Sequence, residues 1–178
     1  MRNQEADPRF VAIDIKTADR HPDSACSVAA VQVEQGRVVD SMHALVRPPR
    51  KDFVLSYSHG ITRDMVAGAA TFAQVWPGVQ KLIRGVDFVA AHNALFHRTV
   101  VQACCTRAGM AIPDLYFKCT ERIAREIFGI YPTDLSNVCC ELRIPLEHHD
   151  VKGAALACAQ IVLAHARRRQ PAYSTPGR

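Results

Sequence analysis

The order of strand and helix patterns along the 178 residues predicts a single mixed α/β domain. Three β-rich segments come first, and compact strand and helix patterns alternate after about residue 70. The chain is 48% hydrophobic, which is enough for one core of ordinary size, and two domains of half this length would each be unusually small. No internal repeat or interdomain linker interrupts the pattern.

The three leading strands are predicted from runs of β-branched and apolar residues. The first run, 10–15, is interrupted only by Asp14, as is typical of a buried central strand that ends at a functional edge. The second run, 27–33, meets Gln35-Gly36, which predicts a hairpin into a third strand that continues to residue 48. We therefore expect three antiparallel strands at the start of the domain.

Helical spacing begins at Thr71, which would cap a helix that ends at Gly85 and leads into a short strand at 88–91. A second helix is predicted at 95–107. The remaining expected elements are a strand at 116–119, short helices near 120–128 and 134–142, and a last helix from about 150 to 168.

The seven cysteines predict reduced thiols that serve as small apolar residues. Their odd number, their two adjacent pairs and the lack of CxxC spacing fit neither a disulfide framework nor a closed zinc site. No apolar run is long enough to span a bilayer, and residues 1–8 carry no apolar signal-peptide core. We therefore expect a cytoplasmic protein that does not associate with a membrane.

The net charge of +5 is concentrated at the C-terminus. Four arginines and no acid lie in the last twelve residues, so subtracting these four charges from +5 leaves +1 for the rest of the chain. The expected organisation is an N-terminal extension at 1–8, one domain at 9–166 and a basic, flexible tail at 167–178. A basic tail is compatible with a nucleic-acid partner but does not by itself require one.

Three short stretches carry a specific resemblance. They are Asp14-Ile15-Lys16-Thr17, the seven residues from Ala91 to His97, and the segment from His149 to Ala154. In order and spacing they resemble the motifs of the DnaQ-like, DEDDh family of 3′–5′ exonucleases, which includes the proofreading subunit of bacterial replicative DNA polymerase and ribonuclease T. The similarity covers about residues 9 to 165 and includes the segments 58–62 and 70–72.

The resemblance implies a ribonuclease H-like fold, with a mixed, mainly five-stranded sheet and helices on both faces. It also implies a site in which four carboxylates hold two divalent metals about 4 Å apart, since hard cations require anionic oxygen ligands. A histidine beside them takes the proton from the attacking water.

Most of the carboxylates of that site are replaced in this chain. Asp14 matches the first carboxylate and His149 matches the general base, whereas Lys16, His97 and Ala154 stand at the other three carboxylate positions. The charge of the four ligand positions therefore falls from −4 in the family to zero here when His97 is neutral. We expect that two magnesium ions would not bind.

Neighbouring acids do not restore the missing ligands. Asp150 is one helical turn, about 5.4 Å, before Ala154 and stands where a helix N-cap is expected. A shift of register that makes His148 the base would place Gly153 at the ligand position.

The first functional hypothesis is a catalytically inactive homologue of these exonucleases that binds a single-stranded or 3′ nucleic-acid end or a nucleotide. Lys16 and a protonated His97 would contact phosphate where the family holds metals, and no cofactor would be needed. The residues predicted to bind the ligand are Thr17, Lys16, His59, His92 and Asn93.

Two other hypotheses stay open. In a scaffold that binds a replication or repair protein, His92 and Asn93 would instead satisfy backbone groups at a strand-to-helix turn. In an altered 3′–5′ exonuclease, Asp14, His97 and His149 would form a two-histidine, one-carboxylate set suited to zinc, manganese or iron rather than magnesium. A divalent metal, magnesium or manganese, would be required only if such activity persisted. A homodimer is also open, because some members of the family dimerise.

Overall fold

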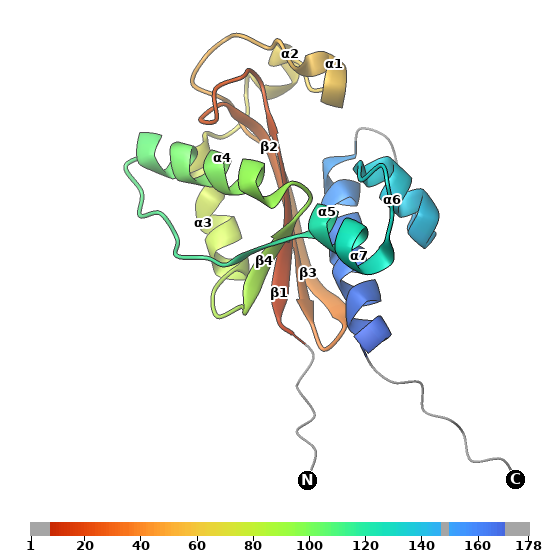
Figure 1. The fold of residues 1–178 in the computed structure, drawn as a ribbon. Helices are drawn as coiled ribbons and strands as arrows, with labels where there is room; N and C mark the ends of the chain where they lie inside the picture. The colour runs from red at the N-terminus through yellow and green to blue at the C-terminus, as the bar shows by residue number, and fades with distance from the viewer. Residues whose placement is uncertain (1–7, 147–149, 170–178) are drawn as a thin grey trace, which may run out of the picture.

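The computed structural model describes residues 8–146 and 150–169. Its centre is a five-stranded sheet with the order β3-β2-β1-β4-β5 and helices on both faces (Figure 1). This is the mixed sheet that the sequence predicted. The strands are β1 (Phe10–Thr17), β2 (Ala25–Glu34), β3 (Arg37–Leu45), β4 (Phe88–Ala91) and β5 (Phe117–Cys119).

The first three strands are antiparallel, and β4 and β5 continue the sheet in parallel with β1. Gln35 and Gly36 have φ values of 50° and 73°, and these positive values allow the two-residue turn between β2 and β3. Strand β3 ends at Leu45, earlier than predicted, and Arg47 instead forms an isolated parallel bridge with Thr71.

The helices form two layers (Figure 1). On one face lie α3 (Phe72–Leu82) and α4 (Ala94–Arg107). The other face is covered by α7 (Val151–Arg169), which contacts α5 and α6. The remaining helical elements are α1 (Ser56–His59) and α2 (Arg63–Val66) at one end of the sheet, α5 (Thr120–Ile123), the π-helical turn η1 (Ala124–Phe128) and α6 (Leu135–Leu142).

The side chains of β1 alternate between these two layers, as expected for a strand. Val11, Ile13 and Ile15 belong to the apolar cluster that includes α3 and α4. Phe10 and Ala12 belong to the cluster that includes α7. Asp14 follows the same alternation as Phe10 and Ala12, so its carboxylate lies on the α7 side of the sheet.

Several local predictions are confirmed. Thr71 caps α3 in a capping box in which Gln74 reaches back to the Thr71 amide. All seven cysteines are free thiols. Burial raises the pKa of Cys26 and Cys158 to about 12, which keeps both thiols protonated. Among the helices of residues 8–146 and 150–169, none is both long and apolar enough to cross a membrane.

The start of the predicted basic tail is helical. Helix α7 continues through Arg169, beyond the predicted boundary at residue 166. Arg168 donates a hydrogen bond to the Ile127 carbonyl at 2.8 Å, and its guanidinium lies 5.5 Å from the centre of the Phe128 ring. At least one of the tail arginines therefore packs against the domain, while residues 170–178 lie outside the described residues.

Candidate site at the ends of strands β1 and β4

The candidate site lies where the parallel strands β1 and β4 end beside each other. Asp14 and Lys16 are on β1, two residues apart and therefore on the same face of the strand. His92 and Asn93 follow β4 directly, and His97 lies in the first turn of α4. Motifs one and two are thus brought together as the sequence predicted.

Asp14 is paired with Lys16. The Lys16 ammonium lies 3.0 Å from Oδ2 of Asp14 and donates a hydrogen bond to Oδ1 at 3.3 Å. The Asp14 side chain is only 6% exposed, whereas that of Lys16 is 30% exposed. The single remaining carboxylate of the ligand set is therefore already neutralised by a cation whose outer side reaches solvent.

His97 completes this cluster as a buried, neutral imidazole. Its Nε2 lies 3.8 Å from Oδ1 of Asp14, and the residue is 4% exposed. Burial lowers the pKa of His97 to about 4, although Asp14 acts in the opposite direction. Near neutral pH the imidazole of His97 is therefore neutral in the structure, which argues against the predicted contact between a protonated His97 and phosphate.

Nδ1 of His97 is buried and has no hydrogen-bond partner among the described residues. An unpaired buried nitrogen costs roughly 1–3 kcal/mol.

His92 holds three segments together. Its Nε2 lies 2.7 Å from the carbonyl oxygen of Thr133, so this nitrogen carries the proton and donates. Its Nδ1 lies 3.0 Å from the hydroxyl of Thr120 and accepts in that tautomer. Burial lowers the pKa of His92 as well. Both ring nitrogens are used inside the fold, which fits the alternative in which His92 satisfies groups of the protein rather than a ligand.

The side chains of Asn93 and His59, like that of His92, form hydrogen bonds inside the fold. Asn93 has a φ of 58°, and its side chain accepts a hydrogen bond from the amide of Phe96 at 3.4 Å, which caps α4. His59 is 5% exposed, and its Nε2 lies 3.1 Å from the carbonyl of Thr17 while its Nδ1 accepts from the amide of Ile61. The side chain of Thr17 is itself buried. These three predicted binding residues therefore fix α1 and α4 to the ends of β1 and β4.

The third motif contributes no ligand atom from its described part. Ala154 lies on α7, is 5% exposed and presents only a methyl group. Asp150 accepts a hydrogen bond from the Lys152 amide at 3.0 Å, which confirms its predicted role as the N-cap. A Cβ at Gly153 would approach Asp150 Oδ2 to 2.7 Å, so glycine leaves room for this cap.

His148 and His149 lie outside the described residues. The role of His149 as a remnant general base and the Asp14, His97 and His149 metal set therefore stay predictions. Within residues 8–146 and 150–169, no group of three His, Cys, Asp or Glu side chains is arranged to hold a metal. At the four ligand positions, Asp14 supplies a carboxylate that is paired with the Lys16 ammonium, His97 supplies a neutral imidazole, and the Ala154 side chain supplies no oxygen. Magnesium, in contrast, prefers several anionic oxygens.

Three large exposed side chains were not predicted. Tyr57 is 82% exposed, Leu95 75% and Tyr131 83%. Each belongs to a segment that is anchored at the site: α1 through His59, the start of α4, and the loop that His92 holds at Thr133. The sequence shows these large residues inside or beside the motifs, but it does not show that they are exposed, because exposure depends on the fold.

Comparison with known proteins identifies the fold and the family. The family model RNase T, described as exonuclease, matches residues 11–157. The curated relatives include PolC-type DNA polymerase III from Thermotoga maritima, which is 26% identical over 162 residues, or 88% of this chain and 12% of the polymerase. The enzyme of the same name from Clostridium perfringens is 27% identical over 161 residues, or 88% of this chain and 11% of the polymerase. The chain thus spans about a tenth of the length of these relatives.

Solved structures share the fold at low sequence identity. Exonuclease X in complex with 5′ overhanging duplex DNA has a TM-score of 0.70 and 22% identity, over 90% of this chain and 94% of that one. The nuclease domain of 3′hExo, a DEDDh family member bound to rAMP, has a TM-score of 0.72 and 16% identity, over 94% and 96%. A 3′-exonuclease that recognises the histone mRNA stem-loop has a TM-score of 0.78 and 15% identity, over 93% and 84%. The predicted ribonuclease H-like fold is confirmed.

Proposed function

Because the chain belongs to the DnaQ-like exonuclease family of DEDDh nucleases, we propose that it uses the family's cleft to bind a nucleic-acid end or a nucleotide without hydrolysing it. The proposed ligand is a single-stranded nucleic acid or the 3′ end of one. No metal takes part.

The ion pair between Asp14 and Lys16 carries the proposal. The ammonium lies 3.0 Å from the only carboxylate that the family's ligand positions retain in the described structure. A unit positive charge about 4 Å from this ammonium is repelled by about 4 kcal/mol at an effective dielectric constant of about 20, and a divalent ion by about twice as much. The remaining ligand positions supply a buried imidazole and a methyl group, so they offer little attraction to offset this repulsion.

Lys16 and the exposed apolar side chains supply the contacts for a nucleic acid. Lys16 keeps 30% of its side chain exposed, so a phosphate oxygen can share the ammonium with Asp14. Tyr57 and Tyr131, each more than four-fifths exposed, offer ring faces on which bases stack, at roughly 1–3 kcal/mol per base. Because Asp14 already neutralises part of the charge, the expected binding is weak and sensitive to salt.

A protein-binding scaffold and an altered metal-dependent exonuclease are the two alternatives to this proposal. The match to PolC-type DNA polymerase III makes a replication or repair protein the second candidate partner. An altered enzyme would need His149 beside Asp14 and His97, and would hold zinc, manganese or iron. The free, protonated thiols suit a reducing compartment, so we also propose a cytoplasmic location.

A restored variant tests the loss of hydrolysis. The unaltered chain and a variant with Lys16→Glu, His97→Asp and Ala154→Asp would be compared for digestion of a labelled 3′ end and for magnesium and manganese binding by calorimetry. Circular dichroism would first establish that the variant is folded, since two of the three positions are buried. We expect digestion and metal binding only in the restored variant. Metal-dependent digestion by the unaltered chain that disappears in Asp14→Ala would refute the proposal.

A second experiment tests binding. A fluorescently labelled single strand would be titrated with the protein at low and at physiological salt, using the unaltered chain, Lys16→Glu and the control Lys81→Glu. Lys81 is an exposed residue of α3 and gives the same charge reversal away from the site. Binding at low salt that Lys16→Glu weakens more than Lys81→Glu supports the proposal. No binding at low salt, or equal binding by all three proteins, refutes it and favours a protein-binding scaffold.

A further inference from the structure

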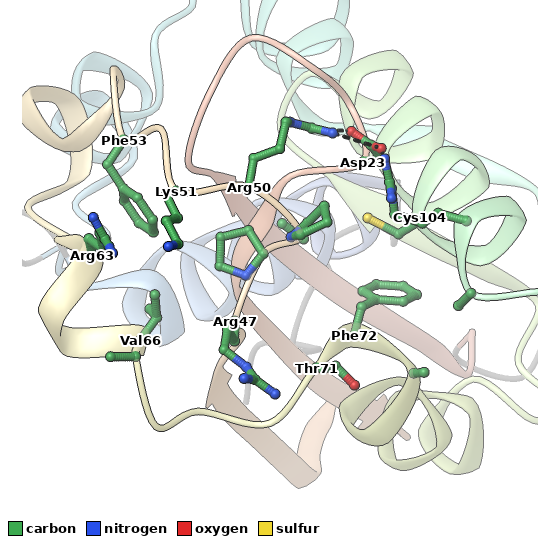
Figure 2. A pocket seen from close by; sticks show the side chains of 17 residues that line it. Asp23, Arg47, Arg50, Lys51, Phe53, Arg63, Val66, Thr71, Phe72 and Cys104 are labelled. Carbon is green, nitrogen blue, oxygen red and sulfur yellow. Dashed lines mark hydrogen bonds and ion pairs between the residues drawn. The ribbon is translucent and has the colours of Figure 1, made fainter.

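A second concave site lies away from the ends of β1 and β4. It is a cavity of about 650 Å³ between α2, α3, α4 and the segment that follows β3 (Figure 2). Its lining residues Ala25, Phe72 and Cys104 belong to the apolar cluster under α3 and α4. None of Asp14, Lys16, His92 and His97 lines this cavity, so it is separate from the candidate site described above.

The rim of this cavity is strongly basic. Its charged lining residues are Arg47, Arg50, Lys51, Arg63, Arg107 and Asp23, so five cations surround one anion. Composition alone did not reveal this cluster, because the chain outside the tail carries a net charge of only about +1 after the four tail arginines are subtracted from +5.

Two of the five cations are fixed by carboxylates. Asp23 accepts hydrogen bonds from both Arg50 and Arg107, and Figure 2 shows the Arg50 side chain reaching the Asp23 carboxylate. Arg50 also donates to Asp19 at 2.9 Å. The hydrogen bond from Arg50, with that from Arg107, holds the pKa of Asp23 well below its usual range. This network keeps two guanidinium groups at one side of the cavity in defined positions.

The other three cations have no such partner. Arg47, Lys51 and Arg63 have exposed side chains and form no ion pair with any residue in the described part of the chain. In Figure 2 all three lie around the opening on the side away from Asp23. Three exposed cations beside one concave surface create a positive potential that attracts an anionic ligand.

The floor between these cations is apolar. Pro48, Phe53, Val66 and Phe72 line it, and Phe72 is supported from behind by Trp76, with ring centres 5.0 Å apart. Thr71 contributes a hydroxyl, but this group already donates to Gln74 at 3.1 Å. No Asn, Gln or Ser is found among the described residues that line the cavity.

We propose that this cavity is a docking site for an acidic linear segment of a partner protein. One bulky apolar side chain of that segment fills the floor between Phe53 and Phe72, and neighbouring Asp or Glu residues contact Arg47, Lys51 and Arg63. A cavity of about 650 Å³ is large enough for one such side chain and the adjoining backbone. The charge complementarity accelerates association and selects against basic segments. This inference does not depend on the proposed function, because it uses a different surface.

The chemistry of the floor favours a peptide over a nucleic acid. A base that entered the floor would bury its polar edge against the carbons of Pro48, Phe53, Val66 and Phe72, and an unpaired buried polar group is unfavourable. A leucine or phenylalanine side chain carries no polar atom and incurs no such cost. An anchor side chain that becomes fully buried on this floor is stabilised by the removal of its apolar surface from water.

Selection of peptides on the full chain tests the proposal. Short random peptides displayed on phage would be selected on the unaltered protein after removal of those that bind an Arg47→Glu, Arg63→Glu variant. We expect enrichment of peptides with two or more acids beside Leu, Ile, Phe or Trp. Synthetic copies should bind about tenfold more weakly to the double variant, measured by fluorescence anisotropy. They should bind undiminished to an Arg37→Glu, Arg84→Glu control, which reverses two exposed charges outside the cavity.

Because all four arginines in these variants are exposed, the substitutions should leave the fold intact, which thermal melts would verify. A lack of enrichment over the double variant, or enriched peptides without acids, would overturn the proposal. So would a labelled oligothymidylate that competes with the peptides and loses affinity in the same variant, because the occupant would then be a nucleic acid.

Discussion

His97 should make the stability of this domain depend on pH between about 4 and 6.5. Burial lowers its pKa from 6.5 to about 4, although Asp14 partly opposes this change. The unfolded chain therefore takes up a proton near pH 6.5, whereas the folded chain resists protonation until about pH 4. The corresponding stability is fully present above about pH 6.5 and is lost as the pH falls towards 4.

The two pKa values give the size of this effect. At about pH 5 the unfolded state is almost fully protonated at this histidine and the folded state is not, so linkage predicts a loss of about 2 kcal/mol relative to neutral pH. Urea denaturation of the unaltered chain and of His97→Gln, at about pH 7.5 and about pH 5, would measure it. His92, whose pKa is also lowered by burial, is present in both proteins, so the comparison reports the part of the loss that depends on His97.

The unaltered chain should lose about 2 kcal/mol more than His97→Gln between these two pH values. In a Lys16→Gln variant this loss should shrink, because the Lys16 ammonium contributes to lowering the pKa of His97. An equal loss in the unaltered chain and in His97→Gln would show that His97 is not the buried, neutral group described above.

Three further substitutions have defined expected results. Burial would raise the pKa of Asp19, but hydrogen bonds from Arg50 and nearby groups lower it to about 2, so Asp19→Asn should cost about 2 kcal/mol at neutral pH. Urea midpoints should show that the unaltered chain loses this advantage as the pH falls from about 4 to 2, and an unchanged pH profile in the variant would contradict the assignment. Asp150→Ala removes the hydrogen bond to the Lys152 amide and should lower the free energy of unfolding by about 1 kcal/mol. The melting temperature should fall accordingly, and an unchanged melting temperature would mean that α7 does not need this cap. Gly36→Ala places a side chain at a φ of 73° and should cost about 1 kcal/mol by chemical denaturation, and a neutral effect would argue against the turn geometry.

Local sequence signals predicted the parts of the fold that local geometry determines. Gln35-Gly36 predicted the hairpin because a two-residue turn needs positive φ values. Thr71 predicted the start of α3 because its side chain can satisfy a free amide there, and the structure adds Gln74 as the second member of the capping box. The contact between Asp14 and Lys16 also follows from local geometry, since side chains two residues apart on a strand point to the same face of the sheet.

Features that depend on tertiary burial were harder to predict. The sequence placed His97 at the site but could not show that its imidazole is 4% exposed, and burial determines its charge. His59 and His92 were predicted to bind a ligand, whereas their partners, Thr17, Thr120 and Thr133, are distant in sequence. Spacing within a motif cannot identify such partners.

The basic cavity illustrates the same difficulty at a larger scale. Its cations lie on three segments of the chain: Arg47, Arg50 and Lys51 after β3, Arg63 on α2 and Arg107 at the end of α4. The last of these is more than 40 residues away from the others in the sequence. Only the packing of α2, α3 and α4 around the end of β3 brings them to one surface (Figure 2).

The alternation of side chains along β1 has a consequence for assembly. Asp14 and Lys16 share one face of β1, whereas Ile13 and Ile15 turn towards α3 and α4, and none of Asp14, Lys16, His92 and His97 lines the basic cavity. Under the two proposals above, a nucleic-acid end and an acidic segment would therefore bind at separate places on the domain and would not compete for space. Bound together, they would be held at a high local concentration of each other, which favours contact between them.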